Sequence, residues 1–324
     1  MKKLFVLFAS IALVAAFAAS SLAADWNFYG SARVKTFYQK DVDANDNSVK
    51  EWDWDLQGNS RIGATVKTND AIGGGFEYGT GVNVRKLYGT WNFGNGELLV
   101  GQNYTPLVAF YSDQVWNSDE GLLSYGDLYG GRQPMLQVKM KNFKVALIKP
   151  GTGGLTNPTD KMIPKIEGSY QMQLDKLTLD FFAGINTVEE NNDHDVDSFA
   201  LGVGGIYNMG PLTLKAKVHI AQNPGNYGLS GWGNCRYYTD GDDSDSVGAI
   251  IVGNYKMSDK MTLQAGWGGA WHDCGDNDDK IAAIYIQAKL DMAPGFFIVP
   301  ELGFIDRDDL GDVTYFGAKW QINF

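Results

Sequence analysis

The sequence has few of the side chains on which most enzyme and metal sites depend. It contains only two cysteines, Cys235 and Cys274, and three histidines, His194, His219 and His272. None of the histidines stands in a recognisable setting for a nucleophile and its base. The sequence therefore predicts no catalytic residues and a protein that is not an enzyme.

Long apolar runs are also lacking after the first 24 residues. In residues 1–23, Lys2 and Lys3 precede the apolar run Leu4–Ala19, and small residues follow. This is the pattern of a secretory signal peptide, whereas the run is short for a membrane anchor, the alternative reading. We expect residues 1–23 to be removed on export and residues 24–324 to form the mature domain, without a membrane-spanning helix.

Positive charge is scarce as well. Lys and Arg number 27 against 38 Asp and Glu, for a net charge of −11, which argues against a nucleic-acid partner. Glycine is abundant at 40 residues, and the mean hydropathy is −0.22 although 44% of residues are hydrophobic. Such a mixture suits a sheet in which apolar and polar residues alternate throughout.

The end of the chain shows this alternation clearly. In residues 313–324 the apolar set is Phe316, Ala318, Trp320, Ile322 and Phe324, and polar residues or glycine stand between its members. A period of two is typical of a strand with one apolar and one polar face.

The same alternation predicts about sixteen strands, an even number that is typical of bacterial outer-membrane barrels. We place them near residues 26–40, 53–68, 71–80, 84–93, 97–104, 132–141, 143–149, 163–174, 177–187, 197–208, 211–222, 246–257, 261–272, 280–292, 296–306 and 313–324. Turn-forming residues join them on one side and long acidic loops on the other. The predicted fold is an all-β, transmembrane, antiparallel barrel that contacts outer-membrane lipid. The alternative is a secreted β-sandwich or β-helix, with the polar strand faces toward solvent.

Aromatic residues fall mostly in the apolar phase near strand ends, as the interface girdles of a membrane barrel require. They are Phe28, Trp91, Phe93, Tyr170, Tyr207, Tyr255, Trp267, Trp271, Phe296 and Trp320.

One connection, residues 105–131, differs from the other loops. It is long and far more apolar than they are, and it carries Asp113, Asp119, Glu120 and Asp127. An apolar loop is not expected to lie in water. Because a barrel of about sixteen strands has a wide aqueous lumen, we expect this loop to fold inward and narrow it.

Four stretches together resemble the general, trimeric, sixteen-stranded porins of Gram-negative outer membranes, and the resemblance covers the whole mature chain. They are F-Y-G-S-A-R-V-K-T-F-Y (28–38), G-N-S-R-I-G (58–63), R-K-L-Y-G-T-W-N-F-G-N-G-E-L-L-V-G-Q-N-Y-T-P (85–106) and K-W-Q-I-N-F (319–324). The resemblance implies a homotrimeric pore whose inward loop sets acids against an arginine-rich wall. It also implies a latch from the second outer loop to a neighbouring subunit, although here only residues 81–83 join the strands concerned.

Five cations are candidates for the wall of this constriction. Alternation places Arg33, Lys35 and Arg61 on the polar phase of their strands. The resemblance adds Arg85 and Arg132, but strict alternation points both outward. A β-bulge is needed to turn Arg85 inward, and without one Lys86 takes its place.

The two cysteines fall in successive outer loops. In an oxidising compartment a disulfide between Cys235 and Cys274 is expected. The alternative is a zinc site that includes His272. No cofactor is predicted, except that the acidic outer loops, such as residues 240–245 and 273–279, allow Ca²⁺ or Mg²⁺ beside lipopolysaccharide phosphates.

Taken together, the sequence predicts an outer-membrane porin for passive diffusion of small hydrophilic solutes and ions. Cations on the wall and acids on the loop would create a transverse field at the narrowest point. Two alternatives remain: a barrel enzyme of the lipase or protease type, which would need His219 or His272 as a base, and a substrate-specific channel.

Overall fold

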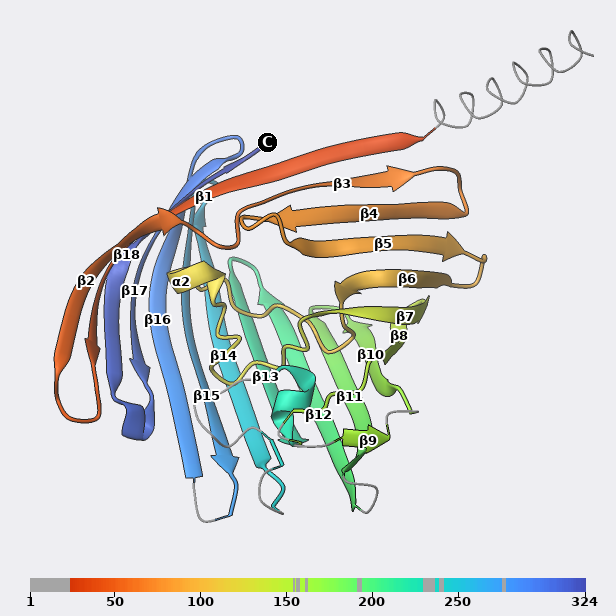
Figure 1. Ribbon diagram of the computed structural model, residues 1–324. Coiled ribbons are helices and arrows are strands. Elements are labelled where there is room, and N and C mark those ends of the chain that lie inside the picture. The colour runs from red at the N-terminus through yellow and green to blue at the C-terminus, as the bar shows by residue number, and fades with distance from the viewer. Residues whose placement is uncertain are drawn as a thin grey trace, which may run out of the picture.

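In the computed structural model of the chain, alternating residues build eighteen strand segments within the described residues, all joined into one sheet (Figure 1). The structure describes residues 24–153, 155, 158–160, 163–190, 194–229, 237–238, 242–275 and 278–324, without the side chains of 158–160, 190, 194 and 309. The predicted signal peptide, residues 1–23, lies outside this part.

The segments are β1 (Asp25–Val42), β2 (Ser48–Leu56), β3 (Arg61–Lys67), β4 (Ile72–Gly79), β5 (Val84–Asn92), β6 (Glu97–Tyr104), β7 (Arg132–Met140), β8 (Phe143–Ile148), β9 (Pro158–Asp160), β10 (Lys165–Leu174), β11 (Leu177–Glu190), β12 (His194–Met209), β13 (Leu212–Gln222), β14 (Asp245–Ser258), β15 (Met261–Asp273), β16 (Asp278–Ala293), β17 (Phe296–Asp306) and β18 (Asp312–Asn323). Three short helical turns are α2 (Trp116–Asp119), η1 (Pro224–Tyr227) and η2 (Asp308–Leu310).

The sheet closes into a barrel. β1 pairs antiparallel with β18, from Ser31 opposite Asn323 to Val42 opposite Asp312. β2 and β3 both pair with β1 and are two parts of one barrel strand, while the three-residue β9 only attaches to β11. The eighteen segments therefore form the sixteen-stranded antiparallel barrel that the sequence predicts, and the pairing of β1 with β18 closes it.

Short and long connections separate to opposite ends of the barrel (Figure 1). The short turns lie where turn-forming residues predict them. Asp175, Gly210 and Gly295 adopt positive φ angles of 48°, 63° and 80° there. Asn, Asp and Gly tolerate this left-handed conformation, which lets two residues reverse a strand.

The two faces of the wall differ as alternation requires. On β16, Ile284 and Ile286 are exposed on the outside, whereas the alternate residues Tyr285 and Gln287 are buried toward the lumen. The predicted girdle aromatics follow the same rule, because most are exposed on the outer face. Apolar residues therefore cover the outside of the barrel, the reverse of a soluble protein.

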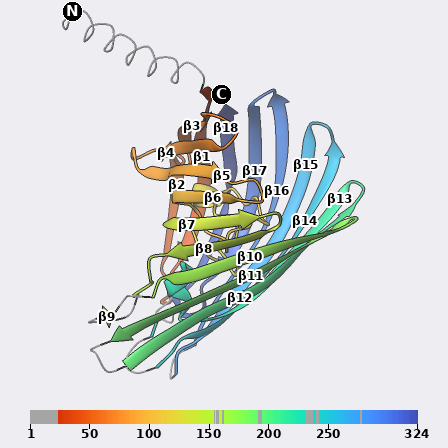
Figure 2. The ribbon, with the colours of Figure 1, turned by 90° about the vertical axis from the view of Figure 1, so that its right-hand side faces the viewer.

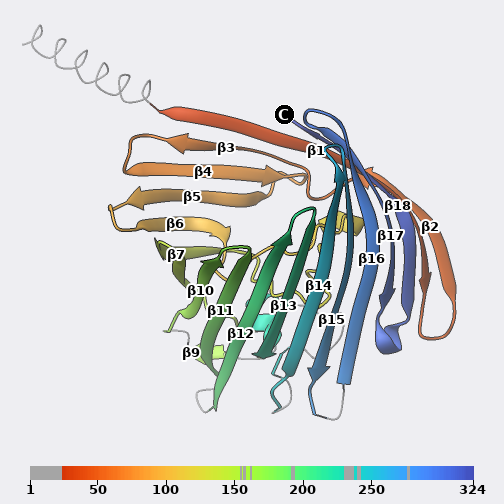
Figure 3. The ribbon, with the colours of Figure 1, turned by 180° about the vertical axis from the view of Figure 1, so that it is seen from behind.

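The barrel has a short side and a long side (Figures 2 and 3). The segments β3–β8 have six to nine residues each, and β11–β18 have 11 to 16. On the short side, only residues 80–83 connect β4 with β5, so the second outer connection is as short as the sequence predicts.

Residues 105–131, hereafter the inner loop, do not extend beyond the barrel rim. Views from opposite sides show this yellow segment, with α2, inside the ring of strands (Figures 1 and 3). Within the part of the chain that the structure describes, no helix is long and apolar enough to cross a membrane.

Candidate functional site: a constriction inside the barrel

The inner loop is held against the long wall by a buried carboxylate. Glu301 of β17 accepts hydrogen bonds from the backbone N–H groups of Val115 and Trp116, at 2.7 and 3.0 Å. Trp116 stacks on Tyr315 with ring centroids 4.9 Å apart. The carboxylate thus satisfies the buried backbone N–H groups at the start of α2, and Tyr315 packs on the apolar ring there.

A buried lysine provides the second anchor. Lys217 of β13 donates to the Asp127 carboxylate at 2.5 Å and to the Ala109 carbonyl at 2.6 Å. Its ammonium also lies 4.5 Å from the centre of the Tyr111 ring. The side chains of Lys217 and Asp127 are at most 1% exposed. Because each charge is paired with the other, the burial of both is tolerated.

Glycines let the inner loop approach the wall backbone to backbone. A Cβ atom on Gly126, whose φ is +88°, would lie 2.1 Å from the carbonyl oxygen of Gly269. A Cβ atom on Gly268 would lie 2.1 Å from the carbonyl oxygen of Tyr125. Side chains at these positions would separate loop and wall.

We expect Gly126→Ala to loosen the inner loop, because the new methyl group meets wall backbone that cannot move aside. Gly131→Ala is the matched control: Gly131 also has a positive φ, +72°, but its Cβ would meet no atom within 4 Å. Both carry the left-handed penalty of about 1–2 kcal/mol, and only Gly126→Ala adds the clash. Current noise of the open channel measures loop motion, and equal noise in both variants would contradict this packing.

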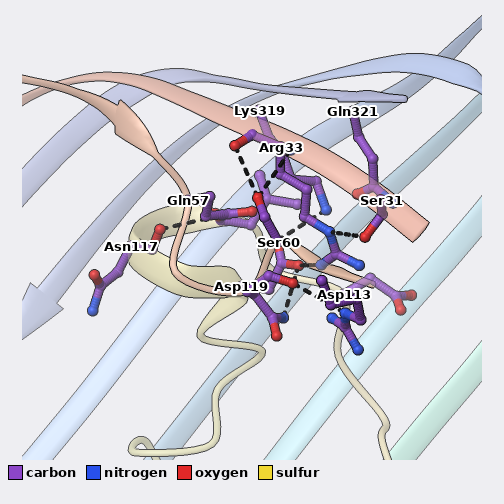
Figure 4. Close-up of polar contacts among 12 residues, drawn as sticks. Ser31, Arg33, Gln57, Ser60, Asp113, Asn117, Asp119, Lys319 and Gln321 are labelled. Atoms are coloured by element: carbon purple, nitrogen blue, oxygen red, sulfur yellow. Dashed lines mark hydrogen bonds and ion pairs between the residues drawn. The ribbon is translucent and has the colours of Figure 1, made fainter. Parts of the chain in front are cut away.

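Asp119 of α2 faces the first and last strands (Figure 4). Its carboxylate pairs with Arg33 of β1 and accepts a hydrogen bond from Lys319 of β18 at 2.9 Å. Asn59 donates to the same carboxylate at 3.1 Å. The opposition of loop acid and wall arginine that the sequence predicts is therefore present at this residue.

A β-bulge brings Arg85 into the lumen. The register between β4 and β5 shifts from Glu77 opposite Lys86 to Tyr78 opposite Val84, so Arg85 is the extra residue. Its Nε donates to Glu77 at 2.7 Å, and Arg61 lies 3.6 Å from the same carboxylate. The bulge therefore turns Arg85 toward the lumen, although strict alternation would point it outward. The Lys86 ammonium also lies 3.8 Å from the Glu77 carboxylate.

Arg132 and Lys35 have different surroundings. Arg132, at the start of β7, donates to the Tyr104 hydroxyl at 3.0 Å and lies 5.2 Å from the centre of that ring. Lys35 pairs with Asp53 of β2 at 2.5 Å. Because Asp53 is a wall residue, Lys35 does not oppose an acid of the inner loop.

One cavity of about 410 Å³ collects most of these groups. All four predicted arginines line it, and of the predicted loop acids Asp113 and Asp119 do. The lining cations are Arg33, Arg61, Arg85, Arg132 and Lys319. The lining of the cavity thus contains five cationic side chains and two carboxylates. A third carboxylate, that of Glu77, is buried and pairs with the lining residues Arg61 and Arg85.

Three predicted members lie elsewhere. Lys35 is held at Asp53, and Asp127 is buried against Lys217 as a loop anchor. Glu120 accepts a hydrogen bond from the Ser124 backbone at 3.0 Å, and burial within the loop raises its pKa. Whether an acid of the inner loop faces the lumen depends on how the loop folds. The spacing of the acids along the sequence does not reveal this.

Sequence reasoning missed four residues with decisive contacts. The place of Lys319 on the polar phase of its strand indicates an ordinary solvated lumen residue, yet it is buried and paired with Asp119. Lys217, Glu301 and Glu77 were not singled out. Their one signal is a charge on the lumen phase of a strand, which they share with truly solvated residues.

The cysteine and histidine predictions have separate outcomes. Cys274, just after β15, is disulfide-bonded, and Cys235, its predicted partner, lies outside the described residues. A sulfur in a disulfide is not a zinc ligand, because zinc needs the thiolate. His219 is buried, and its Nδ1 has no hydrogen-bond partner within the described part of the chain. Among those residues, no group holds this nitrogen as the orienting group of a catalytic base would.

Cation sites in the acidic outer loops stay a prediction. In the described ranges, no group of three or more His, Cys, Asp or Glu is placed to hold a metal ion. Part of residues 240–245 and of 273–279 lies outside those ranges.

No family model and no curated protein matches the sequence. Solved structures do match in fold. OmpT of Vibrio cholerae, an outer membrane protein in its trimer form, is 16% identical, covers 93% of this chain and 100% of its own, and has a TM-score of 0.61. The anion-selective porin from Comamonas acidovorans is 13% identical with the same coverages and a TM-score of 0.67.

The chain has the fold of a porin. Salmonella typhi OmpF, in complex with daunomycin, supports this with 13% identity, coverages of 93% and 98%, and a TM-score of 0.62. Identities this low establish the fold alone, so the properties of the pore are argued from the constriction itself.

Proposed function

We propose that this protein is an outer-membrane diffusion channel for small hydrophilic solutes and ions. The observation that carries the proposal is a closed barrel with an apolar exterior whose lumen is narrowed by an anchored inner loop. An apolar outer surface is stable in hydrocarbon, and the pairing of β1 with β18 satisfies the backbone of both strands where the barrel closes. A polar lumen then supplies the water-filled path.

The constriction would act on solutes through its field. Arg33, Arg61 and Arg85 approach from the short side and the first strand, while Asp113 and Asp119 come from the inner loop. Charges of opposite sign across a narrow opening orient dipolar solutes, and they disfavour bulky apolar solutes that must shed water.

The excess of cations over carboxylates makes anion preference the expected selectivity. In a KCl gradient, the reversal potential should lie on the chloride side, and Arg61→Gln with Arg132→Gln should move it toward the potassium side. Lys289→Gln is the control, because Lys289 pairs with Asp291 and does not line the cavity. If the control moves the potential as far as the arginine pair does, the cavity does not set selectivity.

We further propose a homotrimer assembled through the short side of the barrel. The outer face of β3–β7 exposes Ile62, Leu87, Val100 and Leu136, each by more than half. The trimer form solved for OmpT of Vibrio cholerae, whose barrel has a similar fold, supports the proposal of three subunits. Cross-linking in detergent should end at three subunits and bilayer currents should rise in groups of three; monomers in both assays would contradict the trimer.

Export and catalysis are tested separately. The mature protein should begin at Ala24 and float with outer membranes in a density gradient.

For the hydrolase alternative, His219→Ala should abolish lipid or peptide hydrolysis by purified protein; for the channel, no such activity exists to be lost.

A further inference from the structure

Three aromatic rings gather at one side of the cavity. The ring centroids of Tyr104 and Phe110 are 5.3 Å apart, and Tyr129 lies 6.1 Å from Phe110 and 6.4 Å from Tyr104. All three residues line the cavity. Phe110 is 49% exposed, unlike every other large hydrophobic residue of the inner loop. Phe110, together with the rings beside it, therefore gives the polar lumen an aromatic surface that a solute can reach.

Cations adjoin these rings. The Arg132 guanidinium lies 5.2 Å from the centre of the Tyr104 ring, and the Lys86 ammonium lies 5.1 Å from it. In the part of the chain that the structure describes, no carboxylate lies within 4.0 Å of Arg132, in contrast to Arg33, Arg61 and Arg85. Its charge is therefore not cancelled by an ion pair.

We propose that the constriction favours aromatic carboxylates among the anions that it passes. The solute ring packs on Phe110 and Tyr129 while its carboxylate binds the Arg132 guanidinium. A planar guanidinium suits a carboxylate, and offset or edge-to-face ring pairs are favourable. This inference rests on the proposed channel function and specifies its solute class.

The size and charge of the cavity agree with such a solute. A cavity of about 410 Å³ falls within the roughly 300–1,000 Å³ typical of small-molecule sites. An aliphatic anion would lack the ring contact, a neutral aromatic would lack the bond to Arg132, and an aromatic cation would meet the cationic excess of the lining. Only an aromatic anion uses both groups.

The experiment is a single-channel recording in KCl with benzoate added, compared with cyclohexanecarboxylate, which has nearly the same size and charge but no aromatic ring. Benzoate should interrupt the current for about 3- to 10-fold longer, the factor that ring pairing contributes beyond buried area. Benzyl alcohol, a neutral aromatic, should cause no resolved interruption.

Two variants separate the contributions. Phe110→Leu keeps an apolar side chain of similar size, so KCl conductance should persist while the benzoate advantage falls to within about twofold. Arg132→Gln should shorten interruptions by both carboxylates. Phe143→Leu is the control, because Phe143 is exposed on the outer wall and does not line the cavity.

Equal interruption times for benzoate and cyclohexanecarboxylate in the unaltered protein would overturn the proposal. So would an undiminished benzoate advantage in Phe110→Leu. Either result leaves the KCl conductance in place, and the channel function then stands without this specificity. Absence of any KCl conductance is a different failure, that of the channel itself.

Discussion

Replacing residues 113–127 by a short glycine–serine linker is expected to raise single-channel conductance at least about twofold, because conductance follows the narrowest water column. The segment carries Asp113, Asp119 and α2, which together form the loop side of the cavity. Its loss also leaves Arg33 and Lys319 without their carboxylate. Anion preference should therefore increase together with conductance.

A deletion of similar kind elsewhere serves as the control. Residues 43–47 form the first outer loop and do not line the cavity. Shortening them to a two-residue turn should leave conductance and reversal potential unchanged. If deletion of residues 113–127 changes neither conductance nor ion preference, the inner loop does not form the constriction.

Lys217→Met is expected to release the inner loop from the wall. The substitution leaves Asp127 buried without its cation, and removal of one partner from a buried ion pair costs about 3–5 kcal/mol. The lost bond to the Ala109 carbonyl adds to the effect. Hydrogen exchange of the amides of residues 122–128 should accelerate strongly, whereas the amides of the barrel strands should exchange as before.

The double variant Lys217→Met with Asp127→Asn tests the cause. It removes both charges while an amide oxygen at residue 127 still accepts the bond that the Leu128 N–H now donates to the carboxylate. Protection of the loop amides should largely return. If the single and double variants exchange equally fast, the lysine holds the loop through the Ala109 carbonyl and the Tyr111 ring rather than through its pair with Asp127.

Most of the barrel was predictable because its rules are local. Alternation in residues such as Ile284 to Gln287 sets the two faces of a strand, and residues such as Gly210 and Gly295 set the turns. The sequence predicts a single strand near residues 53–68, which residues 57–60 interrupt between β2 and β3. Strand β2 begins earlier than predicted, at Ser48, because it pairs with β1 from there on. Such an extension depends on the partner strand and is not visible in the segment itself.

The constriction was only partly predictable because its contacts are long-range. Arg33 and Asp119 follow from phase and loop composition, and they meet as predicted. Arg85 needed a bulge, whose position is set by the pairing of β4 with β5. Lys217 and Glu301 depend on where the inner loop settles, and their sequence signal equals that of a solvated lumen charge.

Single-channel recording of the purified protein in planar bilayers tests the central claim most directly. A closed barrel with a water-filled, loop-narrowed lumen predicts discrete, ohmic current steps in KCl that polyethylene glycols block only below a cut-off size. Protein that folds and enters the bilayer yet yields no current steps would contradict the account.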